Sequence, residues 1–425
     1  MRIPVICKKY SRRVLVCLLL FNNSFKGLAY GVLTHEAVID ACWNTLIVPL
    51  IKEKYPSATA DELKEAHAYA YGGAVTPDMG YYPFGSKLFT NLVHYVRSGD
   101  MVAALLKDAN NINEYAFALG FLSHYEADSY GHPIGTNRSV PLTYGRMMKK
   151  YGKVVTYGEN KISHMRMEFG FDVLEVAKGN YASQAYRDFI GFKVDTTVLS
   201  KAFIETYGLS INAVFKGHLN RAVETFRWIA SRMFPVITRA AWSAKKNSIR
   251  KQYATATSRS FRFRMEQREF NKQYGRTYKH PGFSAGLLSL VIRILPKVGP
   301  LRALRFKVPT PESEKYFAQS FDTTIHFYTM SVQKLQRHEL TLKDKDYDTG
   351  QPTADCEYSL ADATYCDWII ALDHDKFAGL DMAMKQNIMT YFTIDNPYKP
   401  PSNASAACAQ FFSACRDIAS FEPTQ

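Results

Sequence analysis

The chain has 425 residues, of which 47% are apolar and 14% aromatic, and this composition excludes a wholly disordered or low-complexity protein. It has no run of eighteen uncharged apolar residues, so we expect no membrane-spanning helix. The net charge is +14, but the first 29 residues hold six basic residues and no acid, which leaves +8 for the rest. This moderate charge does not by itself identify a nucleic-acid-binding protein.

The beginning of the sequence has the pattern of a secretory signal peptide. Lys8, Lys9, Arg12 and Arg13 precede a short apolar run at 14–21, and the small residues Gly27 and Ala29 follow it. We expect cleavage between Ala29 and Tyr30, which removes residues 1–29 and leaves a secreted or periplasmic protein. An uncleaved membrane anchor is the alternative, and the shortness of the apolar run disfavours it.

The cysteines fall into two groups once the signal peptide is removed. Cys356, Cys366, Cys408 and Cys415 lie near the C-terminus, and we expect one or two local disulfides among them, whose pairing the sequence does not give. Cys42 lies in an apolar helical segment and is predicted to be a buried thiol.

Most segments of the chain repeat apolar residues at helical spacing, and alternating strand patterns are scarce. The expected helices are 35–54, 59–72, 86–97, 99–108, 111–130, 160–177, 196–206, 214–245, 312–337 and 376–393. We therefore predict an all-α protein of many short helices.

The composition changes near residue 245. The segment 239–279 holds twelve Lys and Arg against two Glu, and an apolar, basic stretch follows at 285–306. We place a boundary here, between a domain at 30–245 and a mostly helical C-terminal extension at 246–425 of unknown role.

The C-terminal half also contains a segment rich in Asp and Thr at 343–367. Its aspartates weakly resemble an acidic calcium loop, but the glycine falls at the wrong position and a proline intrudes. We therefore expect a solvated loop there.

The N-terminal half contains a series of residues typical of metal ligands. His124 and Asp128 are four residues apart, as are His164 and Glu168, so each pair lies on one face of a helix. His132 follows Asp128, where Gly131 and Pro133 are expected to end the helix.

Three further candidates are His35, Asp78 and His94. Each residue alone has a more ordinary explanation, such as a surface pair, a turn residue or a packed histidine. Together, five histidines and three acids occur in one ordered series, and imidazole nitrogens with carboxylate oxygens suit zinc.

This series resembles the pattern of the zinc-dependent phospholipase C family, whose superfamily also includes the single-strand-specific zinc nucleases. The pattern is an N-terminal aromatic residue, a His, an Asp in a loop, a His, then HxxxD followed by a His, and Hxxx[DE]. It is matched here at Tyr30, His35, Asp78, His94, His124, Asp128, His132, His164 and Glu168. The resemblance covers about residues 30–170 and implies an all-helical domain with three zinc ions.

The resemblance also implies a role for each residue. One zinc ion would be held by Asp78, His94, His124 and Asp128, a second by His132, His164 and Glu168, and a third by His35, Asp128 and the free amine and carbonyl of Tyr30. Asp128 would bridge two ions, and Asp78 is a candidate base that orients the attacking water. Two positions depart from the family pattern: Tyr30 replaces the usual Trp, and His132 follows Asp128 by four residues rather than six.

The first of three functional interpretations is a phospholipase C-like phosphodiesterase. Glu168 favours it, because the phospholipase branch tends to have HxxxE where the nuclease branch has HxxxD. The 285–306 stretch would contact a membrane surface, although a buried helix pair is the more common explanation of such a stretch. One loop contains Met79, Tyr81, Tyr82 and Phe84. These residues would enclose a choline-like cation, or they simply pack in the core.

The second interpretation is a single-strand nuclease or nucleotidase. The spacing from Tyr30 to His35 is closer to the nuclease branch, and the basic run at 239–279 would follow a phosphate backbone, unless it is an ordinary solvated helix face. The third is a non-catalytic, zinc-stabilised binding protein, which the full ligand set disfavours. We predict a secreted trizinc phosphodiesterase with phospholipid as its substrate class.

Overall fold

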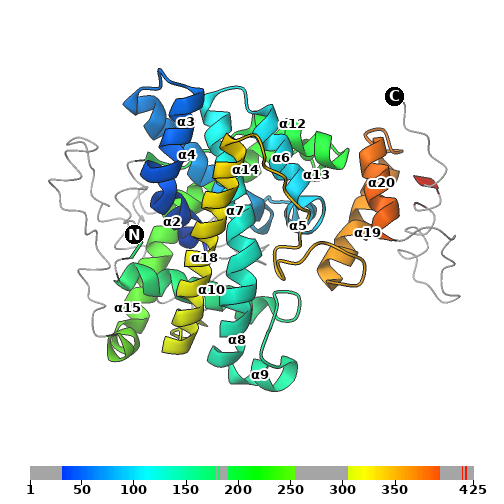
Figure 1. The fold of residues 1–425 in the computed structure, drawn as a ribbon. Coiled ribbons are helices and arrows are strands. Elements are labelled where there is room, and N and C mark those ends of the chain that lie inside the picture. Colours follow the sequence, from blue (N-terminus) through cyan, green and yellow to red (C-terminus); the bar gives the residue numbers. More distant parts are fainter. Residues whose placement is uncertain are drawn as a thin grey trace, which may run out of the picture.

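The computed structural model describes residues 31–178, 180–181, 190–253, 305–392, 414 and 417–418. These residues form a helical molecule (Figure 1), and the β-structure among them is limited to an isolated bridge between Lys345 and Pro352. The predicted all-α fold is confirmed. In the same ranges, no helix combines the length and the apolar content needed to cross a bilayer.

The first part of the chain contains the predicted helices and several short additional ones. In order they are α2 (Val32–Cys42), η1 (Trp43–Ile47), α3 (Val48–Lys54), α4 (Ala60–Val75), η2 (Thr76–Tyr81), α5 (Lys87–Tyr95), α6 (Ser98–Asp108), α7 (Ile112–Tyr130), η3 (Gly131–Thr136), α8 (Asn137–Thr143), α9 (Gly145–Tyr151) and α10 (Lys161–Lys178). The helix predicted at 35–54 is therefore three consecutive segments, and α8 and α9 were not predicted.

The later part is helical as well. It contains α12 (Thr196–Tyr207), α13 (Ile211–Val214), α14 (Leu219–Trp228), η4 (Ile229–Met233), α15 (Phe234–Gln252), α18 (Pro311–Gln336), α19 (Ser359–His374) and α20 (Met382–Tyr391). The sequence did not predict α19, which overlaps the Asp- and Thr-rich segment at 343–367. Its apolar residues, such as Trp368 and Leu372, are nevertheless fully buried.

Polar residues fix where several helices begin. Thr59 and Glu62 form a capping box at the start of α4. The Asn111 side chain accepts hydrogen bonds from the first free N–H groups of α7, and Thr310 does the same for α18. These caps define the ends of the helices that form the centre of the molecule.

Helix α7 lies at the centre of the fold, where it packs against α4, α6 and α18 (Figure 1). Its neighbour α18 comes from the C-terminal half, and a single hydrophobic core includes residues from both halves, such as Phe121 and Trp368. Helix α15 runs through residue 245. The division at that residue stays a prediction, and the core shows that the C-terminal half packs onto the N-terminal half.

Some predicted features fall outside the described residues. These are the signal peptide at 1–29, Tyr30, the 285–304 part of the apolar, basic stretch, Cys408 and Cys415. The disulfides therefore stay predictions, with Cys356 exposed and Cys366 half-buried. Cys42 is buried as predicted, and burial raises the pKa of its thiol to about 12.

The backbones of α4 and α7 approach each other closely at two glycines. A Cβ atom at Gly73 would lie 2.0 Å from the carbonyl oxygen of Phe117, and one at Gly120 would lie 2.1 Å from that of Ala70. No larger residue fits without moving one helix. The contact holds α4 and α7 in register beside His124 and Asp128.

We therefore expect Gly120→Ala to destabilise the protein by about 1–3 kcal/mol, since overpacking forces the two helices apart. Urea unfolding followed by circular dichroism measures this change. Gly145→Ala is the control, because nothing lies within 4 Å of a Cβ atom there. Equal stability of the two variants would show that α4 and α7 separate at little cost.

Candidate metal centre

Eight of the nine predicted ligand residues lie together in the structure, and Tyr30 lies outside the described residues. They form three groups whose potential ligand atoms lie within 4.8 Å of one another: His35, His124 and Asp128; Asp78, His94 and His124; and His132, His164 and Glu168. Each of the eight side chains is at most 1% exposed. The structure brings the eight residues to one buried place, and metal binding there stays a prediction.

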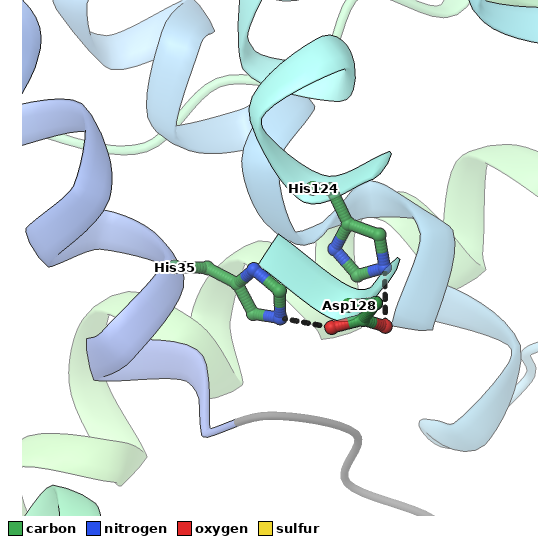
Figure 2. Close-up of side chains that lie close together, drawn as sticks. All are labelled: His35, His124 and Asp128. Carbon is green, nitrogen blue, oxygen red and sulfur yellow. Dashed lines mark ion pairs between the residues drawn. The ribbon is translucent and has the colours of Figure 1, made fainter. Parts of the chain in front are cut away.

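Asp128 is the residue shared across this centre. Its Oδ1 atom lies 3.4 Å from Nε2 of His35 and 3.3 Å from Nε2 of His132. Its Oδ2 atom lies 3.1 Å from Nε2 of His124 and 3.5 Å from Nε2 of His94. Figure 2 shows Asp128 and His124 on α7 with His35 reaching them from α2. One carboxylate therefore touches a histidine of every group.

Local helical geometry brings His132 to this carboxylate. The α-helix ends at Tyr130 as predicted. The chain continues as the π-helix η3, whose wider turn keeps a residue four positions later on the same side. His132 therefore faces Asp128 despite its short spacing.

Backbone carbonyls orient two of the histidines. Nδ1 of His94 donates to the carbonyl oxygen of Thr90, and Nδ1 of His124 donates to that of Ala74, both at 2.8 Å. A carbonyl oxygen only accepts, so in each neutral ring the proton is on Nδ1 and the lone pair is on Nε2. Nε2 of each ring faces Asp128 and is the atom that the neutral ring would offer to a metal.

His164 is oriented in the opposite sense. Its Nε2 atom donates to Oδ1 of Asn137 at 2.9 Å, and its Nδ1 atom lies 2.9 Å from Glu168. The Asn137 amide in turn donates to the backbone carbonyl of Asp348 at 2.7 Å, which fixes which end of the amide faces His164. Nδ1 is therefore the atom that His164 offers to a metal.

The ligand candidates fit zinc because several of their buried oxygen and nitrogen atoms lack hydrogen-bond partners within the described ranges. Both carboxylate oxygens of Asp78, Asp128 and Glu168 are buried without a hydrogen-bond partner among the described residues, as is Nε2 of His94 and of His124. Buried polar atoms of this kind are costly unless something compensates them. A divalent cation that prefers nitrogen and oxygen ligands would do so.

Burial and charge set the protonation of the centre before any metal binds. Burial raises the pKa of Asp78 and, together with the nearby carboxylates, raises that of Glu168 well above its usual value. Burial alone would lower the pKa of His94, but the neighbouring carboxylates of Asp128 and Asp78 outweigh it and raise this pKa to about 10. At neutral pH, His94 therefore carries a proton.

Of the predicted substrate-binding loop, Tyr81 lies beside the centre. Its ring is 6.3 Å from the ring of His94 and 6.0 Å from that of Tyr157, which in turn lies 5.7 Å from the ring of His164. Both tyrosines are buried. Tyr81 is thus the loop residue that the structure places next to the ligand candidates.

The other three loop residues have different surroundings. Met79 is fully buried in the hydrophobic core, and the ring of Tyr82 packs edge-to-face on Phe226. Phe84 is half-buried under the guanidinium of Arg221, 4.0 Å away, and lines a surface pocket of about 780 Å³. The role of these three residues in substrate binding stays a prediction.

The acidic segment of the C-terminal half contributes residues that the sequence reading missed. The expected solvated loop is wrong, because Asp346 and Asp348 are buried. Tyr347 is also buried, and its ring lies 5.1 Å from that of His94 and 5.8 Å from that of His124. No local spacing indicates these contacts, since they join segments more than 200 residues apart.

The comparison with protein families agrees with this geometry. Residues 34–217 match the model described as zinc dependent phospholipase C, and the match contains all eight ligand candidates described above. Residues 34–217 belong to the zinc-dependent phospholipase C family. No curated protein and no solved structure matches the chain. The phospholipase C domain supports a zinc-dependent hydrolase with a phospholipid substrate, whereas Asp348 lies outside the matched residues.

We expect zinc binding to release protons, because His94 must lose its proton to act as a ligand and the raised pKa of Glu168 favours its protonated form. Since protons then compete with zinc, the affinity should fall as the pH is lowered from about 8 to 6. Titration calorimetry in buffers of different ionisation enthalpy measures the release. His94→Ala should release about one proton fewer, and zinc binding without proton release in the unmodified protein would contradict these assignments.

Proposed function

We propose that the protein is a secreted phosphodiesterase that binds three zinc ions and hydrolyses phospholipid head groups. The observation that carries the proposal is the buried carboxylate of Asp128 among four histidines, inside a segment that belongs to the zinc-dependent phospholipase C family. Removal of residues 1–29 would free the amine of Tyr30 next to α2, where the ligand series begins.

The three groups of side chains divide the proposed ions among them. Asp78, His94, His124 and Asp128 would hold the first ion, and His132, His164 and Glu168 the second. His35 and Asp128, with the amine and carbonyl of Tyr30, would hold the third. Bound zinc would lower the pKa of a coordinated water and neutralise the charge of the phosphodiester.

Asp78 is the best candidate for the base. Its Oδ1 atom lies 3.5 Å from Nε2 of His94, and burial raises the pKa of its carboxyl. A carboxylate with a raised pKa accepts a proton from water more readily than an exposed one. Asp78 would thus orient the attacking water, while Asp128 holds the ligand groups together.

Phospholipid is favoured over nucleic acid for two reasons. The matched family is a phospholipase family, and Glu168 occupies the position where the nuclease branch tends to have Asp. The described part of the basic run, in α15, has exposed Lys246, Arg250 and Lys251 beside the buried Ile249. That pattern is typical of a helix with one solvated face, which needs no nucleic acid to explain it.

The proposal is tested by incubating the zinc-loaded protein with phosphatidylcholine vesicles and, separately, with single-stranded DNA. We expect release of diacylglycerol and phosphocholine from the vesicles, and loss of this activity with a chelator. Cleavage of DNA with no lipid product would favour the nuclease interpretation. Inactivity on both substrates, in protein that retains zinc, would favour the non-catalytic one.

We further expect Asp128→Asn to lower activity more than His132→Ala does. Asp128 contacts four histidines, whereas His132 serves one of the three groups. Losing the shared carboxylate should therefore disturb more than one ion and reduce turnover by about 10²-fold or more. Steady-state kinetics and elemental analysis of both variants decide the point, and equal losses would count against a bridging role.

A further inference from the structure

The loop at residues 343–350, which we call the Asp348 loop, connects α18 to α19 and is fixed against the phospholipase C domain. The backbone N–H of Tyr347 donates to the carbonyl oxygen of His94 at 3.1 Å. The side chain of Asp344 accepts from the backbone N–H groups of Gly99 and Asp100. The loop therefore has a defined position relative to the metal candidates.

The side chain of Asp348 reaches one of these candidates directly. Its Oδ1 atom lies 3.4 Å from Nδ1 of His132. The other nitrogen of the same ring, Nε2, lies 3.3 Å from Asp128 and 3.9 Å from Glu168. The imidazole ring thus stands between Asp348 and the ligand groups, so Asp348 faces the histidine from behind and does not share its ligand atom.

Two tyrosines hold the Asp348 carboxylate in place. Its Oδ2 atom accepts hydrogen bonds from the hydroxyl of Tyr95, at 2.9 Å, and from that of Tyr358. The hydroxyl of Tyr358 itself accepts from the backbone N–H of Gly158 at 2.9 Å. A buried carboxylate needs such donors because its removal from water is costly, and they leave Oδ1 directed at His132.

The backbone of Asp348 reaches a second ligand candidate through one intermediary. Its carbonyl oxygen accepts from the amide of Asn137, and that amide accepts from Nε2 of His164. Asp348 thus supports both histidines of the group formed with Glu168. Its carboxylate faces His132, and its backbone carbonyl holds the Asn137 amide that bonds His164.

We propose that Asp348 is a positioning residue of the metal centre, through which the C-terminal half of the chain orients His132 so that Nε2 binds zinc. The proposal rests on the zinc-binding function proposed above. With a carboxylate facing Nδ1, the proton of the neutral ring stays on that nitrogen and the lone pair stays on Nε2. The carboxylate also makes the ring a stronger ligand, and removal of such a partner lowers metal affinity by about 10–100-fold.

The test uses the full-length protein and compares Asp348→Asn with Asp346→Asn. Asp346 is a matched control, since it is buried in the same loop and bonds to Thr349 rather than to a ligand candidate. Burial raises the pKa of Asp346 to about 8, so replacement by Asn removes little charge at neutral pH. Zinc affinity is measured by competition with a chelator, and the ligand field by the visible spectrum of the Co²⁺-substituted protein.

We expect Asp348→Asn to weaken the binding of one zinc ion by about 10–100-fold and to change the Co²⁺ spectrum, with Asp346→Asn close to the unmodified protein. Tyr358→Phe, which removes one hydroxyl donor, should change both readouts in the same direction by less. In the His132→Ala background, Asp348→Asn should have little further effect, because both changes act through the same ring.

Four results distinguish the possible failures. Unchanged zinc affinity and spectrum in Asp348→Asn would overturn the positioning role. Equal losses of zinc affinity in Asp348→Asn and Asp346→Asn would overturn it by showing that the loop acts only through folding. A full effect of Asp348→Asn in the His132→Ala background would overturn it for the same reason. Absence of zinc binding by the unmodified protein would instead overturn the proposed function itself.

Discussion

The arrangement of this protein depends on one carboxylate, that of Asp128, buried at the centre of the molecule without access to water. Histidines offset part of this cost: burial alone would raise the pKa of Asp128, but His124 and His132 outweigh it and hold this pKa well below its usual value. Asp78 and Glu168 add further acidic groups nearby. A site of this composition is short of positive charge, and divalent cations are the natural way to supply it.

Helix packing fixes the positions of two of the histidine rings. The close approach of α4 and α7 at Gly73 and Gly120 brings the carbonyl oxygen of Ala74 to the ring of His124. On α5, the carbonyl oxygen of Thr90 does the same for His94 within a single helical turn. Because rigid backbone atoms hold these two rings, the ligand atoms are preorganised, and the stability of the helix pair and the precision of the site are linked.

The fold class and the ligand residues could be predicted because their signals are local. His124 and Asp128, or His164 and Glu168, are four residues apart on one helix, and this spacing alone places them on one face. Asp348 carries no such signal, since only the packing of distant segments brings it to His132. Its acidic segment predicts a solvated loop, because acidic composition usually means exposure. The hydroxyl of Tyr95, which helps to permit burial of the carboxylate, lies 253 residues away in the sequence.

The separation of Asn137 and Asp348 by 211 residues bears on how the protein is made. Chains leave the ribosome from their N-terminus, so the segment that belongs to the phospholipase C family emerges well before the Asp348 loop does. During that interval His132 and His164 lack the contacts that orient them. The nascent chain would therefore hold an unfinished site, and stable metal loading would come late, after synthesis of the C-terminal half.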